Sequence, residues 1–488
     1  MRIGVVAKYI GVSLMLVSGF MLLSALVALL HGGDDSIIPL LYSGVVTGVL
    51  GIFPSFFVRR TGKLSQREGY LIVVGSWLLS CFTGMIPYLL YGGEFGFVNA
   101  MFESVSGFTT TGASILNDIE ALPRGLLFWR MSTAWIGGIG IVVLFSLLVP
   151  SSSGNDTTLA GVEVSEIARD SSRLKPSSFV HMMIGVYLAL SIGAFLSLKL
   201  CGLGWFDAAT QAMSAISTCG FSTRNASIAA FDSVAVELVL SVFMIMASLR
   251  FSLIFSFVFD KGHSKLFSSE VTRTFLLMIA VGVALLTAGL GISGYYDSFG
   301  TCLRVSTFQV ASIFTTTGFA TVDTNLWPPF CASVIVAGSI VCGCSGSTSG
   351  GMKVDRLLLA AKAFANKVKS LQNPNILSPV KVDGQIKREK AINTVMIFIA
   401  SYLVIILLGA LVNSMAGLDL KTAWTASVAC MGNVGPGLGD VGSMANYAAL
   451  PGLVKWNSMA LMLIGRLEIF PLFYVFGQFG RSNRSFSK

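Results

Sequence analysis

The chain has 488 residues, of which 54% are hydrophobic and only 12% are charged, and its mean hydropathy is +0.77. Soluble domains average about 25% charged residues, so this composition excludes a water-soluble globular protein and predicts an all-α polytopic membrane protein. The net charge is +9, with eight cysteines and three histidines. Because the cysteines form no CxxC pair and the histidines are scattered, neither a zinc site nor a disulfide framework is predicted.

Ten apolar stretches are candidates for membrane spans, because crossing a hydrocarbon core about 30 Å thick takes about 20 helical residues. In chain order they cover residues 5–30, 37–58, 70–91, 126–149, 179–200, 234–259, 274–292, 330–361, 392–415 and 453–479. Nothing but a short loop separates the first two. Residues 1–58 are therefore predicted to form an extra N-terminal pair of transmembrane helices.

The later spans come in pairs, each separated by a short and weakly apolar segment. These segments begin near residues 97, 206, 301 and 420 and run about ten residues to a tip rich in threonine or glycine. Asn99 and Asp207 are expected to cap short helices there. A helix too short to span returns the chain to the side it came from, so successive units keep one orientation. This predicts four parallel helix–pore loop–helix repeats around one central pore, over residues 69–150, 176–259, 271–370 and 391–480.

The tips carry a repeated motif. Phe-Thr-Thr-Thr-Gly occurs at residues 108–112 and 314–318, and residues 217–221 and 432–436 fill the same slot in the other two units. Non-helical backbone is tolerated at membrane depth only where it is buried in protein or lines water. Four such loops can replace the hydration shell of a cation with carbonyl oxygens, and glycine permits the required backbone turn.

The predicted potassium filter takes three residues from each tip: Thr110, Thr111, Gly112, Thr218, Cys219, Gly220, Thr316, Thr317, Gly318, Asn433, Val434 and Gly435. The tips hold no formal charge, which favours a monovalent cation, since divalent-selective pores more often use carboxylate rings. The alternative for one motif alone is a Ser/Thr/Gly helix-packing face. Four copies in register favour the filter.

The span 330–361 is interrupted by small polar residues that should unwind it beside water: Gly343, Cys344, Ser345, Gly346, Ser347, Thr348, Ser349, Gly350 and Gly351. A phosphate-binding loop is excluded because Met352 follows where GxxxxGK[ST] needs lysine, and because no βα unit precedes it. A glycine-rich hinge without further function is one interpretation of this stretch.

Four charged residues within or beside the spans need partners. Arg466 lies in a predicted span, where an arginine costs about 2.5–3.5 kcal/mol on insertion scales. It is predicted either to face the cation cavity or to pair locally with Glu468. Arg130 and Arg250 are expected to form structural pairs. Glu103, beside the first tip, is expected to brace that loop from behind, with a part in ion coupling as the alternative.

Basic residues gather on one side of the predicted topology, in segments 59–67, 169–175, 261–273, 353–390 and 481–488. The opposite loops carry mainly acidic residues, among them Asp34, Glu94 and Asp118. By the positive-inside rule both termini are predicted to be cytoplasmic. The positive charge therefore indicates topology and contact with membrane lipid, and no nucleic-acid partner is expected.

Taken together, these motifs resemble the Trk/Ktr/HKT superfamily of potassium transporters, most closely its bacterial TrkH type. The residues that carry the resemblance are 103–112, 220–223, 315–319 and 433–437, and it covers nearly the whole chain. Glycine in all four filter positions resembles the potassium-selective members, whereas sodium-selective plant relatives tend to carry serine in the first. Cys219 and Gly432 depart from the family pattern.

The resemblance implies potassium as the transported ion, no organic cofactor in this chain, and a multi-pass position in the bacterial cytoplasmic (inner) membrane. It also implies a homodimer controlled by a cytosolic TrkA-type ring that binds NAD or ATP/ADP, with segments 169–175 and 353–390 as possible docking sites. Residues 343–351 would be an intramembrane gate beneath the filter, and Arg466 would hold that gate.

The predicted function is thus gated potassium uptake, not catalysis, since the spans offer no cluster of histidine, aspartate or glutamate. A less selective or sodium-handling channel or symporter of the same fold is the first alternative. A secondary transporter for an organic solute is the second, although such proteins typically show inverted repeats. Whether uptake is coupled to protons or sodium, or is channel-like, is left open.

Overall fold

The computed structural model describes residues 2–58, 64–148, 176–259, 264–373, 379–475 and 477. Its N-terminal part consists of α1 (Ile3–Leu30), α2 (Ile37–Phe57), α3 (Gln66–Gly84), α4 (Ile86–Tyr91), α5 (Phe97–Phe108) and α6 (Arg124–Leu148). The second repeat comprises α9 (Pro176–Leu200), α10 (Trp205–Ser217), the 3-10 helix η1 (Ser227–Phe231), α11 (Val234–Ala247) and α12 (Phe251–Phe259).

The third repeat contains α13 (Ser264–Ser268), α14 (Glu270–Ile292), α15 (Phe299–Phe314), η2 (Thr324–Leu326), α16 (Pro329–Ile340) and α17 (Val354–Gln372). Strand β1 (Val341–Cys342) pairs in parallel with β2 (Met352–Lys353), and β3 (Lys381–Val382) pairs antiparallel with β4 (Gln385–Ile386). The fourth repeat comprises α18 (Glu389–Met415), α19 (Leu420–Gly432), η3 (Gly439–Val441) and α20 (Gly452–Arg466).

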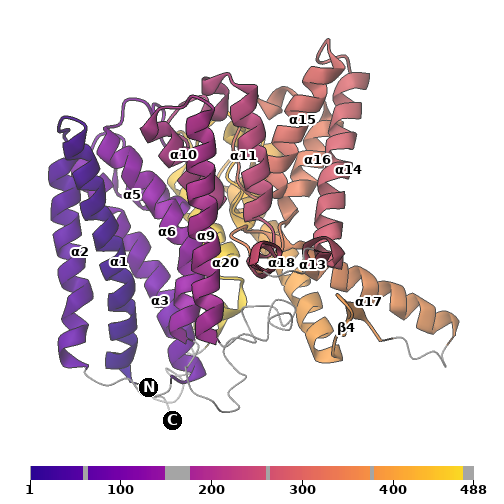
Figure 1. Cartoon of the computed structure of the whole chain (residues 1–488), viewed down its shortest axis with the longest axis horizontal. Coiled ribbons are helices and arrows are strands. Elements are labelled where there is room, and N and C mark those ends of the chain that lie inside the picture. The colour runs from indigo at the N-terminus through magenta and orange to yellow at the C-terminus, as the bar shows by residue number, and fades with distance from the viewer. Residues whose placement is uncertain are drawn as a thin grey trace.

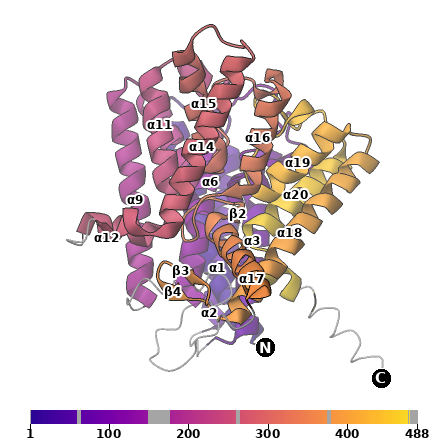
Figure 2. The same ribbon diagram turned by 90° about the vertical axis from the view of Figure 1, so that its right-hand side faces the viewer.

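The long helices stand side by side, and the short helices α5, α10 and α15 lie in the upper half of the bundle (Figure 1). Turned by 90°, the molecule shows α18, α19 and α20 at one flank and α9 and α11 at the other, with α15 and α16 between them (Figure 2). One apolar core joins the second and third repeats. A second joins α1 and the first repeat to the fourth repeat. The repeats therefore meet side by side, and the fourth packs against the first.

Six of the described helices are long and apolar enough to cross a membrane, or seven if the bent pair α11–α12 is one span. Their outward apolar side chains, such as Leu196, Leu285 and Leu407, are exposed, as expected for surfaces that meet lipid. The predicted interruption of the span 330–361 is confirmed, because α16 ends at Ile340 and α17 begins at Val354.

Two predicted spans are wrong as continuous helices. The span 234–259 breaks between α11 and α12 with a bend of 106°. The span 453–479 breaks after Arg466, where Glu468 and Ile469 take positive φ angles of 56° and 63°. Both breaks lie at tertiary contacts that a hydropathy pattern does not register.

The predicted N-caps of the first two short helices are also wrong. The chain enters α5 at Gly96 and α10 at Gly204, without side-chain caps. Asn99 Nδ2 instead donates to Glu94 O at 2.8 Å, and the Asp207 carboxylate accepts from residues of the loop that follows α10. Both polar side chains thus bind neighbouring loops and do not cap the helices.

A candidate cation pathway at four helix ends

Each of the four short helices ends in the same turn. One or two residues after each helix, a residue takes a left-handed conformation, with φ of 52° at Thr110, 54° at Thr218, 61° at Thr316 and 52° at Asn433. The next backbone N–H then donates back across the last helical turn, from Thr111 to Ser106 O (2.9 Å), Cys219 to Ser214 O (3.0 Å), Thr317 to Ser312 O (2.8 Å) and Val434 to Ala429 O (2.9 Å). This is the Schellman pattern of helix termination.

Threonine is an unusual residue for this conformation. A positive φ is a genuine outlier for a β-branched residue, and such outliers persist only where the surrounding structure imposes them. The glycine two positions later also has a positive φ, between 79° and 94° in the four tips. The sequence-predicted triplets therefore coincide with four segments of equivalent backbone.

The four tips form a closed ring, in chain order. A Cβ atom on Gly112 would overlap the backbone oxygen of Cys219, and one on Gly220 would overlap that of Thr317. In the same way Gly318 abuts Val434 O, and Gly435 abuts Thr111 O. Each glycine thus lets the next tip approach, and the fourth tip returns to the first.

Among the described residues, the carbonyl oxygens of the ring are free to bind a ligand, except that of Gly435, which accepts from Tyr447 Oη at 3.2 Å. No hydrogen bond from a described residue reaches the backbone oxygens of Thr110 to Gly112, Thr218 to Gly220, Thr316 to Gly318, Asn433 or Val434. All of these residues are buried except Gly112, Gly220 and Gly318, which are partly buried. Buried carbonyl groups are normally paired, so a ring of unpaired ones fits a site whose partner is a cation.

The middle side chains of the tips are held by the protein. Thr111 Oγ1 lies 2.8 Å from Thr109 Oγ1, and Thr317 Oγ1 lies 2.7 Å from Thr315 Oγ1. Asn433 Nδ2 donates to Thr111 Oγ1 at 3.0 Å. Cys219, which departs from the family pattern, therefore differs from the other tips in its side chain, whereas the backbone of its tip is equivalent to theirs.

The second departure, Gly432, has a steric reason. This residue ends α19, and a Cβ atom there would lie 2.6 Å from Ser339 O on α16. Such a separation is too short for a carbon–oxygen contact, so a larger residue would push the third and fourth repeats apart.

A buried ion pair lies behind the first tip. Glu103 Oε1 accepts from Arg130 Nε at 2.5 Å, and both side chains are almost fully buried. Glu103 Oε2 also accepts from the Ile115 N–H at 3.1 Å, just beyond the tip. Arg130 donates to Ser222 O at 2.9 Å and stacks on the Phe221 ring, 3.7 Å from its centroid. The expected pairing of Arg130 and the bracing contact of Glu103 are both present, and together they tie the first tip to the second.

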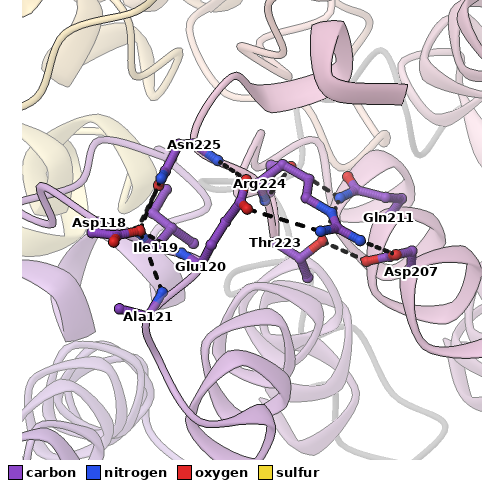
Figure 3. Close-up of polar contacts among 10 residues, drawn as sticks. Asp118, Ile119, Glu120, Ala121, Asp207, Gln211, Thr223, Arg224 and Asn225 are labelled. Carbon is purple, nitrogen blue, oxygen red and sulfur yellow. Dashed lines mark hydrogen bonds and ion pairs between the residues drawn. The ribbon is translucent and has the colours of Figure 1, made fainter. Parts of the chain in front are cut away.

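A second set of contacts joins the same two repeats through the loops that follow their tips (Figure 3). Asn225 Nδ2 donates to Asp118 Oδ1 at 2.8 Å, and the Ile119 N–H donates to Asn225 Oδ1 at 2.6 Å. Arg224 donates to Asp207 Oδ2 at 2.8 Å. Asn225 therefore bridges the loops that follow the first and second tips.

This network lowers the pKa of Asp118. The hydrogen bond from Asn225 is the largest cause, and the backbone N–H groups of Ala121 and Glu120 add to it. The carboxylate is therefore held in its ionised form.

The interrupted segment 343–351 lies directly against the tips. The Gly350 N–H donates to Thr316 Oγ1 at 2.8 Å, and Gly350 packs against Asn433. Thr348 Oγ1 lies 3.0 Å from Ile216 O and 3.1 Å from Ala247 O. The segment thus contacts the inner ends of the second, third and fourth tips or of the helices that carry them.

The break between α11 and α12 in the second repeat also contacts residues 343–351. The Cys344 N–H donates to Ser248 O at 2.9 Å, and the Phe251 N–H donates to Gly346 O at 3.1 Å. These are the residues at which α11 and α12 part. The bend between the two helices therefore exposes backbone groups that bind residues 343–351. Arg250, in the same break, forms an ion pair with Asp383 at 3.6 Å, in agreement with the structural pairing expected for it.

Arg466 is buried and binds two backbone carbonyls. Its Nη1 donates to Thr348 O at 2.8 Å and its Nη2 to Gly137 O at 3.1 Å. The alternative of a local pair with Glu468 is wrong, because Glu468 forms its ion pair with Arg356 on α17. The left-handed turn after Arg466 carries Glu468 away from its neighbour in sequence.

Two further charged residues lie at this level: Asp355 escaped the sequence analysis, and Lys353 was assigned only to the basic segment 353–390. Lys353 is buried and donates from Nζ to Ser349 O, and Asp355 accepts from the Ser345 hydroxyl at 2.7 Å and the Ser345 N–H at 3.0 Å. A signal existed, since two charges follow directly on an unwound apolar span. Of the two suggested docking segments, residues 169–175 lie outside the described residues.

Comparison with known proteins agrees with this geometry. A profile of the TrkH family, described as "Cation transport protein", matches residues 43–488. The Trk system potassium uptake protein TrkH of Halomonas elongata is 33% identical and covers 98% of both chains. Its namesake from Salmonella typhimurium is 31% identical, over 98% of this chain and 99% of its own.

A solved structure shows the same fold. The crystal structure of the potassium transporter TrkH from Vibrio parahaemolyticus aligns with a TM-score of 0.88 at 31% identity, over 97% of this chain and 98% of that one.

Proposed function

This chain belongs to the TrkH family of cation transport proteins, and from that premise we propose that it takes up potassium through the ring of four tips. The family consists of transport proteins and not enzymes. The relatives compared above are named as potassium uptake proteins, and this chain matches them from end to end.

One observation carries the proposal. Four equivalent tips close into a ring in which each glycine packs on the next tip's backbone oxygen, and the carbonyl oxygens, except that of Gly435, receive no hydrogen bond from a described residue. Carbonyl oxygens without a formal charge suit a monovalent cation that has lost its water. The short helices also point their C-terminal ends, with about half a negative charge each, toward the ring.

Residues 343–351, with Arg466, are proposed as the gate. Their contacts with Thr316, Asn433 and Ile216 support a position across the pathway at the inner end of the ring. An arginine beside a cation pathway raises the barrier for cations. In this proposal the gate opens when the segment leaves its contacts with the second, third and fourth repeats.

Regulation is proposed to come from outside the chain. Membership of the Trk system fits a homodimer bound by a cytosolic nucleotide-binding ring. The distribution of basic residues supports cytoplasmic termini and placement in the bacterial inner membrane. The helix α17 projects from the bundle at the end opposite α5, α10 and α15 (Figure 1), and it continues directly from the gate, so it is the proposed contact for the ring.

The test is cation flux into proteoliposomes that contain this protein alone, with potassium, rubidium, sodium and lithium compared. Potassium and rubidium should pass well ahead of sodium and lithium. Equal passage of sodium would contradict potassium selectivity and favour the sodium-handling alternative. If all four ions are blocked, the assay is repeated with the cytosolic partner, and a continued lack of flux would contradict the proposal.

A further inference from the structure

An apolar cavity lies beside the pore, between α1, α3 and α6. Its volume is about 150 Å³, and it reaches the end of α5 at Phe108, two residues before the first tip. This is less than the range of about 300–1,000 Å³ that is typical of small-ligand sites, so the cavity can take only part of a molecule.

The wall of the cavity suits hydrocarbon. It is lined mainly by aliphatic and aromatic side chains from the four helices, and no lining residue is charged. The hydroxyls of Ser13 and Ser76 lie 3.3 Å apart and bond to each other. These two groups therefore need no polar ligand.

The mouth of the cavity opens where the protein meets the membrane. Val12 and Leu16, both on α1, line the cavity and are 37% and 38% exposed. They lie in the middle of a 28-residue apolar helix that qualifies as a membrane span. At this depth the surroundings are lipid acyl chains, because the hydrocarbon core contains no water that could fill an open apolar site.

We propose that an acyl chain of a bilayer lipid enters this cavity past Val12 and Leu16 and packs against α6 beside the first tip. This inference depends on the membrane position of α1 and not on which ion the ring selects, so it can fail while the proposed function stands, and the reverse.

The inner end of the cavity gives an occupant a direct contact with the pathway. Gly137 lines it, and a Cβ atom on Gly137 would overlap Phe108 O at the end of α5. The Gly137 carbonyl also accepts the hydrogen bond from Arg466 Nη2 at 3.1 Å. An acyl chain there would support the one stretch of α6 that touches both the first short helix and the proposed gate residue.

Gly140 offers a way to fill the site. A Cβ atom on Gly140 would meet only Trp77, at 3.8 Å, so a leucine side chain at this position points into the cavity. Gly19 on α1 is the matched control, because a Cβ atom there would have no neighbour within 4 Å. Gly140→Leu should therefore exclude the lipid, and Gly19→Leu should not.

The experiment uses the full chain in proteoliposomes doped with phosphatidylglycerol that carries a diazirine on its acyl chain. After illumination, labelled peptides are mapped by mass spectrometry. Label is expected on the buried wall residues Ser76, Trp77 and Ser80 of the wild type and of Gly19→Leu, and it should fall to background there in Gly140→Leu. A second variant at the mouth, Val12→Phe, should reduce the same label if Gly140→Leu does not fold.

Label on Ser76, Trp77 and Ser80 that both cavity variants leave unchanged would overturn the proposal, since it would not depend on the space in the cavity. Absence of label from these three residues in the wild type would overturn it as well.

Discussion

Three threonines and one asparagine hold the left-handed turn that begins each tip. Glycine would adopt this conformation at lower cost, so the choice of a side chain needs a reason. Thr316 Oγ1 accepts the Gly350 N–H of the proposed gate, and Asn433 Nδ2 reaches Thr111 on the neighbouring tip. Two of the four strained residues, Thr316 and Asn433, therefore supply contacts between tip and gate and between tips that glycine could not make.

Replacing Gly112 by alanine should damage two tips at once. The new Cβ atom would overlap Cys219 O, and the residue would still need a φ of 79°. We expect loss of potassium preference over sodium in the flux assay, because the substitution distorts the first tip and also displaces a carbonyl oxygen of the second tip. Gly185→Ala on α9, where a Cβ atom meets nothing within 4 Å, is the control. Unchanged selectivity in Gly112→Ala would remove Gly112 from the filter.

Replacing Glu103 by glutamine should destabilise the fold more than it changes ion preference. Arg130 would remain buried without its counter-charge, and breaking one partner of a buried pair costs about 3–5 kcal/mol. We expect a clear drop in the thermal unfolding temperature in detergent. Glu94→Gln, at an exposed position that bonds Asn117, should change it little.

The double variant Glu103→Gln with Arg130→Met distinguishes bracing from ion coupling. It removes both charges, so part of the lost stability should return. If the single variant kept its stability and instead lost ion dependence of flux, Glu103 would belong to the coupling machinery.

At the scale of elements, each repeat has a helix that follows its tip, and three of these four helices are broken at the level of the proposed gate. The breaks fall between α11 and α12, between α16 and α17, and after α20. Each break frees backbone or directs a charge toward residues 343–351: Ser248 O binds Cys344, and Arg466 binds Thr348 O. The gate is therefore held by the ends of broken helices and not by a packed helical surface.

Replacing Arg466 by glutamine should raise basal cation flux. The shorter neutral side chain loses the positive charge and at least one of the two carbonyl contacts, at Thr348 and Gly137. Hydrogen bonds from charged groups contribute about 1.5–3 kcal/mol each, so a substantial loosening of the segment is expected. Tracer rubidium uptake without any partner protein measures it. Arg124→Gln, an exposed position on α6, should leave uptake as it is, and an equally unchanged Arg466→Gln would argue against a gating role.

At the scale of the whole molecule, the repeats are joined in a ring by contacts between residues about a hundred positions apart. Asn225 bridges Asp118 and Ile119 across the first two repeats, and Asn325 bonds both the carbonyl and the N–H of Gly439 across the last two. Such loop contacts keep the four tips at one level.

Replacing Asn225 by alanine should weaken the first of these bridges in a pH-dependent way. The folded protein lowers the pKa of Asp118, mainly through Asn225. A lowered carboxyl pKa contributes stability above the unfolded value of about 3.9 and loses it as the pH falls through the folded pKa. The difference in unfolding temperature between wild type and Asn225→Ala should therefore be present at neutral pH and shrink in acid.

The control for this change is Asn393→Ala, at an exposed position on α18. Its unfolding temperature should follow that of the wild type at every pH. A difference for Asn225→Ala that stayed constant down to strong acid would show that ionised Asp118 is not the partner that matters.

The sequence alone determined the membrane class, the four repeats and the twelve tip residues, because these depend on local composition and on a motif that recurs at similar intervals. It also located the interruption at 343–351 and the need of Arg466 for a partner. Hydropathy could not reveal the breaks after Ala247 and Arg466, and N-cap preference misplaced the starts of α5 and α10.

Only the tertiary structure decided how these parts meet. The order of the tips around the ring, the choice of Arg356 as the partner of Glu468, and the hold of Arg466 on Thr348 all join residues more than ninety positions apart. The physical reason is that the sequence can show that a buried charge or carbonyl group needs a partner, whereas packing determines which group becomes that partner. Local patterns thus predict which polar groups need a partner, and the fold determines which residue is that partner.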